Sequence, residues 1–294
     1  VIALILCQNF IAIGLAKLLH ISPLVGLCTG SIPMIGGHGT AGAFGPVLEE
    51  AGVAGANAVA IASATFGLVA GCMIGGPLAY RRIHSLNLKS TETATGSDEI
   101  TVDKNEVTGA IDSRRFLDSA LYLAIAIGAG TIVSLFLNKL MTFPSYIGAM
   151  VVAAIIRNIV DATHKDMPME EISTIGSFSL SLFLGLAMMG LKLWQLAELA
   201  LPMIVMLAAQ TVLMAVFAYF VVFNLLGKNY DAAVMTSGFC GFGMGATPNA
   251  MANMQAITAK YGPAPTAYFV VPLVGSLFID FFNALIITTF MNFL

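Results

Sequence analysis

Long apolar runs alternate with shorter polar segments along this chain, and several runs are long enough to cross a membrane. A spanning helix needs about 20 mainly apolar residues, and seven runs approach or exceed that length. They are Val1–Leu19, Asn57–Ala79, Leu117–Leu137, Pro144–Val160, Ser173–Gly190, Leu199–Leu226 and Ala264–Leu294. Because the last two are longer than a bilayer requires, we expect them to be tilted or broken.

Two further apolar segments contain too much glycine and proline to form continuous helices. Ser22–Gly55 is centred on GSIPMIGGHGTAGAFGP, and Asp231–Gly262 contains SGFCGFGMGATPNA. Inside a helix, glycine costs about 1 kcal/mol and proline about 3 kcal/mol relative to alanine. Non-helical backbone persists at membrane depth only where protein or a water-filled cavity satisfies it. We therefore predict non-helical backbone in both segments and interpret them as re-entrant loops.

A polar stretch separates two apolar parts of the chain. Between Ala79 and Phe116 the sequence is rich in serine and threonine and carries charges of both signs, which is typical of a solvated linker. The predicted organisation is therefore a first part over residues 1–80 (span, re-entrant loop, span), a linker over 81–116, and a second part over 117–294 (four spans, re-entrant loop, span).

Basic residues indicate the direction of the spans. If the linker is cytoplasmic, only Lys17, Lys139 and Lys192 lie outside, and every other lysine and arginine lies on the cytoplasmic side. The two predicted loops then enter the membrane from opposite faces. That arrangement is the pattern of an inverted repeat.

The two loop regions also resemble each other in order. A helix with Gln8-Asn9 precedes GGHGT at Gly36–Thr40, and a helix with Gln210-Thr211 precedes GFGMGAT at Gly241–Thr247. Inverted repeats with broken elements near the midplane are typical of secondary transporters. The sequence thus predicts an all-α membrane protein, an inverted-repeat secondary transporter with seven spanning helices and two re-entrant loops.

The start of the chain looks incomplete against this pattern. Each loop, together with the helix before it and the helix after it, forms one unit. In the second part three predicted spans precede this unit, whereas none precedes it in the first part, which opens with a valine inside an apolar run. We therefore expect about three spans before Val1.

Composition supports the membrane interpretation and argues against other classes. Hydrophobic residues make up 58% and charged residues 10% of the chain, whereas soluble proteins carry about 25% charged residues. A net charge of −3 gives no basic surplus for nucleic acid. The four cysteines lie far apart without a CxxC pair, which argues against zinc or disulfides. Nucleophile or metalloprotease signatures are missing, so we expect no enzyme.

The glycine-rich tips are the candidate substrate site. Glycines let backbone groups point at a ligand, and a helix that starts after the tip favours an anion. The alternatives are close helix packing for the glycines and helix capping for the short polar residues. The predicted substrate-binding residues are His38, Gly39, Thr40, Gly243, Gly245, Thr247 and Asn249.

A carboxylate inside the last span is the candidate for ion coupling. Asp280 is costly at membrane depth, and Asn283 three residues later shares its helix face. Together they offer oxygen ligands for sodium, although Asp280 could instead make a structural hydrogen bond. Gln8, Asn9 and Gln210 either join helices or bind ligand directly.

Several motifs together resemble one family of membrane carriers. They are GGHGT at Gly36–Thr40, ATFGL at Ala64–Leu68, IGGP at Ile74–Pro77, LSLFL at Leu180–Leu184, MGLKLW at Met189–Trp194, GKNYDAAV at Gly227–Val234, CGFGMGATPNAMANMQAIT at Cys240–Thr258 and VVPLVGSLFID at Val270–Asp280. In these motifs the chain closely resembles the bacterial sodium/glutamate symporters. The likeness covers nearly the whole chain outside the linker.

This resemblance implies two inverted five-span halves, each with a re-entrant loop before its fifth span. It further implies inward transport of L-glutamate with sodium across the bacterial inner membrane by an elevator-like movement, and a homodimer is compatible with it. The residues alone indicate only a carrier of small anionic or polar solutes. Two alternatives therefore stay open: a sodium- or proton-coupled carrier of another carboxylate, and an ion channel with paired re-entrant loops.

Overall fold

The structure is a computed structural model that describes residues 1–90, 113–139, 146–164, 166–189, 193–275 and 279–294. Within these ranges the chain forms helices joined by turns, and no strand occurs among them. The helices pack into two compact units, one made of Val1–Thr95 with Lys192–Leu294 and the other of Gly96–Leu191. An all-helical chain is thereby confirmed for the described residues.

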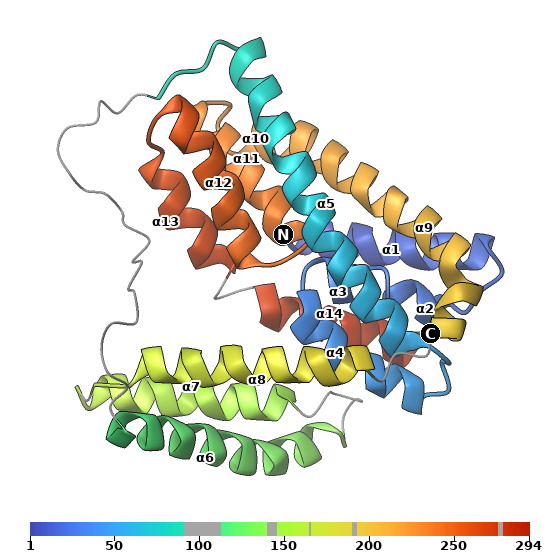
Figure 1. Ribbon diagram of the computed structural model, residues 1–294, viewed down its shortest axis with the longest axis vertical. Helices are drawn as coiled ribbons and strands as arrows, with labels where there is room; N and C mark the ends of the chain where they lie inside the picture. Colours follow the sequence, from blue (N-terminus) through green and yellow to red (C-terminus); the bar gives the residue numbers. More distant parts are fainter. Residues whose placement is uncertain (91–112, 140–145, 165, 190–192, 276–278) are drawn as a thin grey trace. The chain divides into compact units, whose positions relative to one another are not determined.

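The first unit contains the elements that surround the glycine-rich segments. Its elements are α1 (Ile2–Leu18), α2 (Pro23–Leu27), α3 (Ser31–Met34), α4 (Gly37–Glu50), α5 (Ala56–Ser85), α9 (Leu193–Val216), the π-helix η1 (Phe217–Val222), α10 (Phe223–Leu225), α11 (Tyr230–Gly243), α12 (Thr247–Tyr261), α13 (Pro265–Val274) and α14 (Asp280–Phe293). Figure 1 shows α11 and α12 as neighbouring helices, and α5 packs against both of them.

Local signals in the sequence account for the ends of these helices. Asn229 caps α11 by accepting a hydrogen bond from the backbone N–H of Ala232 at 2.8 Å. A proline lies in the first turn of both α12 and α13, where its missing N–H has no partner to lose. Gly55, with a φ of +78°, lets the chain turn into α5.

The glycine-rich segments differ from the prediction in their backbone. The sequence predicts non-helical backbone through both, but α3 and α4 occupy much of the first segment and α11 and α12 nearly all of the second. The interruptions are short: Cys28–Gly30 and Ile35–Gly36 lie in the first segment, and Met244–Ala246 lies in the second. Burial in contact with α5 offsets the intrinsic cost of glycine, because packing rather than propensity supplies most helix stability in proteins.

The second unit is a set of three helices. They are α6 (Ser113–Leu137), α7 (Tyr146–Ala162) and α8 (Met169–Met189), and α6 packs against the other two (Figure 1). The backbones of α6 and α7 approach closely, since a Cβ on Gly148 would stand 2.1 Å from the Gly130 carbonyl oxygen. Arg115 makes ion pairs with Glu171 at 2.9 Å and Asp166 at 3.1 Å.

The helices have the length and surface expected of a membrane protein. Three of the described helical stretches are long and apolar enough to cross a bilayer: Ala56–Ser85, Ser113–Leu137 and Leu199–Leu225. Large apolar side chains are strongly exposed on them, with Ile132 at 71% and Leu225 at 80%. Such surfaces suit lipid rather than water.

The remaining predicted spans coincide with apolar helices without reaching that criterion. The last of them, Ala264–Leu294, contains α13 and α14, and residues 276–278 between these helices lie outside the described residues. Most of the predicted linker, residues 91–112, also lies outside them. The two compact units are defined by how the helices pack, whereas the predicted parts were defined by the proposed repeat. The units therefore do not test the boundaries at 80 and 116, which stay a prediction.

Candidate functional site

The two glycine-rich tips lie against each other within the first unit. Gly37 opens α4 with a φ of +58°, a conformation that favours glycine. A Cβ on Gly37 would stand 2.8 Å from the carbonyl oxygen of Gly245, in the turn between α11 and α12. The backbones of the two tips are therefore in direct contact, and this contact depends on a residue without a side chain.

Side-chain amides of α1 and α12 join the second tip to neighbouring helices. Gln8 of α1 donates from Nε2 to the Gly243 carbonyl oxygen at 2.9 Å. Asn249 of α12 donates from Nδ2 to the Leu68 carbonyl oxygen of α5, also at 2.9 Å. One turn later, Asn253 donates from Nδ2 to the Gly71 carbonyl oxygen at 3.0 Å. The α11–α12 pair is thereby attached to α1 and α5.

A stripe of glycines on α5 brings its backbone close to the second tip. A Cβ on Gly67 would stand 2.3 Å from the Met244 carbonyl oxygen, and one on Gly71 would stand 2.9 Å from the Cys240 carbonyl oxygen. These glycines are four residues apart and so share one helix face. Close helix packing, the alternative that the sequence analysis left open for the glycine-rich tips, does occur between α5 and the second tip.

The first tip is anchored through Ser31 at the start of α3. The backbone N–H of Ser31 donates to Oδ1 of Asn9 in α1 at 3.0 Å. The carbonyl oxygen of Ser31 accepts from Nδ2 of Asn283 in α14 at 3.1 Å. One residue thus joins the first tip to two helices that are far apart in sequence.

His38 lies just beyond the first tip and pairs with Thr65 of α5. Its Nε2 is 3.0 Å from Thr65 Oγ1, which is also 3.1 Å from the Ile61 carbonyl oxygen. Because the hydroxyl proton goes to that carbonyl, we assign Nε2–H of His38 as the donor to Thr65. This tautomer leaves Nδ1 of His38 as a hydrogen-bond acceptor.

The other predicted substrate residues differ in how accessible they are. Gly39 is exposed, and Thr40 is half-buried beside Gly36. Thr247 is half-buried, with its Oγ1 3.1 Å from where a Cβ on Gly275 would stand. Gly245 is buried at the contact between the tips, where Gly37 faces it.

Two predicted substrate residues are already engaged in holding the fold. Gly243 is buried, and a Cβ there would stand 2.9 Å from the end of the Met214 side chain, while its carbonyl oxygen accepts from Gln8. The amide of Asn249 donates to Leu68. These two residues therefore hold the second tip in place, and Nδ2 of Asn249 also lies 2.8 Å from where a Cβ on Gly245 would stand.

The two predicted sodium ligands lie in different surroundings. Asn283 is 1% exposed and bonds to Ser31, whereas Asp280 at the start of α14 is exposed within the described part of the chain. Their spacing of three residues places them on neighbouring parts of the helix surface, but only Asn283 reaches the first tip. Among the described residues, no cluster of three His, Cys, Asp or Glu side chains could hold a metal ion.

Three residues of this region were missed by the sequence analysis. Ser31, Thr65 and Asn253 make the bonds that hold the two tips, but their residue types are common in transmembrane helices as inter-helix contacts. A signal existed for two of them, since Thr65 and Asn253 lie within motifs that carry the family resemblance. Ser31 carried no such signal.

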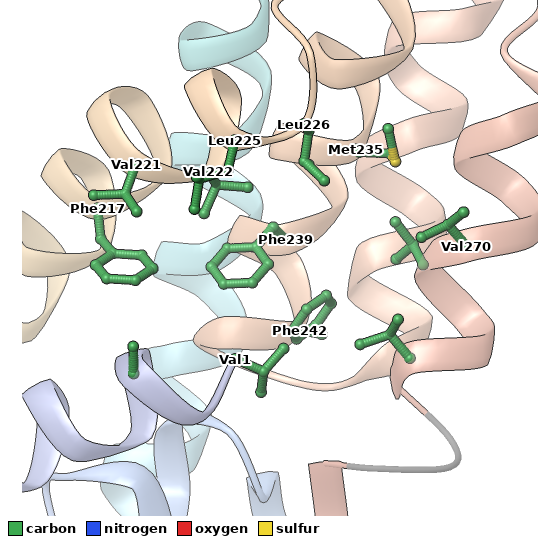
Figure 2. A pocket seen from close by; sticks show the side chains of 13 residues that line it. Val1, Phe217, Val221, Val222, Leu225, Leu226, Met235, Phe239, Phe242 and Val270 are labelled. Carbon is green, nitrogen blue, oxygen red and sulfur yellow. The ribbon is translucent and has the colours of Figure 1, made fainter.

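A cavity elsewhere in the first unit is lined only by apolar side chains. It has a volume of about 280 Å³, and Phe217, Phe239, Phe242, Val1 and Val270 are among its lining residues (Figure 2). An amino acid with two carboxylates would leave its charges unpaired there. The cavity is therefore a poor place for a polar substrate, and the tips are the better candidate.

Comparison with known proteins gives a consistent result. The family model for the sodium/glutamate symporter matches residues 1–263. The sodium/glutamate symporter of Escherichia coli (strain K12) is 44% identical over 99% of this chain and 73% of its own length. The sodium/glutamate symporter of Haemophilus influenzae is 37% identical over 96% of this chain and 71% of its own length. No solved structure matches.

The helices and their apolar surfaces are those of a helical membrane protein, and two interrupted helical segments meet at their glycine-rich tips. Interrupted helices of this kind occur in many membrane carriers. The chain belongs to the sodium/glutamate symporter family. That family consists of transporters and not of enzymes.

Proposed function

We propose that this protein carries L-glutamate across the bacterial inner membrane together with sodium ions. The names of its relatives support both the substrate and the coupling ion. The observation that carries the proposal is the contact between the two tips, where Gly37 meets the Gly245 carbonyl oxygen. A carrier needs a polar site between elements that can separate. The contact between the tips meets this need, because it is formed by polar backbone groups without interlocking side chains.

The substrate would lie where the tips meet. The first N–H groups of α4 have no partner within the helix and form a site of positive potential for a carboxylate of glutamate. Gly39 leaves that helix start open, and the hydroxyls of Thr40 and Thr247 are suited to a second carboxylate contact. Nδ1 of His38 can accept a hydrogen bond from the α-ammonium group. Gly243 and Asn249 act indirectly, by holding the second tip.

The arrangement in the membrane is part of the same proposal. Seven spans and two re-entrant helical hairpins would form an inverted repeat, with the linker over residues 81–116 in the cytoplasm. Movement of one part of the protein relative to the other, as in an elevator, would carry the site across the bilayer. The protein could act as a homodimer without change to this site.

Sodium coupling would involve the region of Asn283 and Asp280 on α14. Sodium bound there would favour the glutamate-binding state, and glutamate would favour sodium binding to the same degree. Replacing Asp280 by asparagine removes its charge and keeps its size, so we expect the sodium concentration for half-maximal uptake to rise by about threefold or more. Uptake with an unchanged sodium dependence would remove Asp280 from the site.

The proposal is tested by L-glutamate uptake into proteoliposomes that contain the full-length protein, with and without an inward sodium gradient. We expect accumulation only with sodium, blocked by excess L-glutamate and not by citrate. Accumulation with a proton gradient alone, or a block by citrate, would favour the alternative carrier of another carboxylate. Ion currents without coupled accumulation would favour a channel.

A further inference from the structure

Three buried, uncharged side chains from three helices meet at the start of α3. They are Asn9 of α1, Ser31 of α3 and Asn283 of α14, with exposed fractions of 0%, 0% and 1%. Asn9 Oδ1 accepts from the Ser31 N–H, and Asn283 Nδ2 donates to the Ser31 carbonyl oxygen. These two bonds fix which end of each amide is oxygen and which is nitrogen.

The remaining polar atoms of this cluster have no partner. Ser31 Oγ and Asn283 Oδ1 are buried and make no hydrogen bond in the described part of the chain. A buried polar atom without a partner costs roughly 1–3 kcal/mol. These two oxygens belong to residues joined by a hydrogen bond, and a ligand bound by both would satisfy them.

The chemistry of the free atoms selects the kind of ligand. Carbonyl and hydroxyl oxygens are ligands for hard cations, and Asn9 Oδ1 keeps a second lone pair beside its bond to Ser31. The free nitrogen of Asn9 is a donor, so it takes no part in holding a cation. None of the three side chains is charged, so the cluster suits a monovalent ion better than a divalent one, which is usually bound through carboxylates.

We propose that Ser31 Oγ, Asn283 Oδ1 and Asn9 Oδ1 form a sodium site between α1, α3 and α14. The inference rests on the proposed sodium-coupled function. It joins Asn283 to Ser31, which the sequence analysis did not single out, and to Asn9, for which a ligand role was left open. Asp280 is not a ligand in this set, since it is exposed; its charge, one turn earlier on α14, would act on the ion from outside the site.

The position of this site accounts for coupling to the substrate. Ser31 begins the short helix that leads to the tip at Ile35–Gly36, so an ion there would fix the first tip against α1 and α14. Its uncompensated positive charge, in surroundings of low dielectric constant, would also favour a carboxylate nearby. Glutamate would then bind well only after the ion.

The test is sodium binding to the purified full-length protein without glutamate, measured as the rise in Tm with sodium chloride at constant total salt, using choline chloride as the balance. We expect Ser31→Ala and Ser31→Cys to raise the half-saturating sodium concentration at least about tenfold, a loss of roughly 1.4 kcal/mol of binding free energy. Ser63→Ala is the matched control, because Ser63 is an equally buried serine on α5 whose Oγ also makes no hydrogen bond in the described part of the chain.

The two serine variants also separate an ion ligand from a structural hydroxyl. Because Ser31 Oγ is buried without a partner in the ion-free protein, its removal should leave the Tm in sodium-free choline chloride unchanged or raise it. A wild-type sodium curve in both Ser31 variants would overturn the inference, and so would a lower sodium-free Tm with no change in the curve. Either result leaves the proposed function intact as long as wild-type glutamate uptake still requires sodium.

Discussion

Replacing Gly37 by alanine should reduce sodium-driven glutamate uptake to less than about a tenth of the wild-type rate. The left-handed conformation at a φ of +58° costs an L-residue roughly 1–2 kcal/mol. In addition, the new methyl group would stand 2.8 Å from the Gly245 carbonyl oxygen, a distance at which one tip must move. A tenfold change corresponds to about 1.4 kcal/mol, so the combined effect should exceed that limit.

Gly52→Ala is the control for backbone strain alone. Gly52 also has a positive φ, +91°, but a Cβ there meets no atom within 4 Å. Uptake is measured in proteoliposomes at equal protein content, with insertion checked by surface labelling. If both variants lose the same share of activity, the strain and not the contact between the tips is responsible, and the site must lie elsewhere.

The fold class could be predicted because it depends on composition and on apolar run length. Helices were expected and found over each predicted span in the described residues, since an apolar run of that length leaves the backbone no other way to satisfy its polar groups. The helical state of the glycine-rich segments could not be predicted. Asp231–Gly262 forms α11 and α12 because their contacts with α5, far earlier in the chain, offset the poor propensity.

The sequence was sufficient to predict which two segments form the candidate site, but not the hydrogen bonds that hold them in place. Glycine and short polar residues at Gly36–Thr40 and Gly241–Thr247 drew attention to both tips, and Gly37 and Gly245 do meet. Ser31 could not be found in this way, because its importance comes from Asn9 and Asn283, two residues on other helices. Long-range pairing of this kind leaves no local pattern in a single sequence.

The second large effect is expected at Gly67, where α5 passes the second tip. Replacement by valine would place a Cβ 2.3 Å from the Met244 carbonyl oxygen, an atom of the backbone that cannot rotate away. Overpacking of this kind typically costs 1–3 kcal/mol. We therefore expect the Tm of the purified protein to fall by roughly 5 °C. Uptake should fall with it, because the displaced residue adjoins Gly245.

Gly14→Val provides the control for this prediction, because it makes the same substitution inside α1, a helix of the same unit, at a position where a Cβ meets nothing within 4 Å. Both variants carry the same cost of a β-branched residue in a helix, so the difference between their Tm values isolates the contact with Met244. Equal Tm values would mean that α5 and the second tip are not packed as closely as the structure has them. A lower Tm for Gly67→Val alone would establish that the second tip depends on α5 for its position. The loss of glutamate uptake in the same variant would then measure how strongly transport depends on that position.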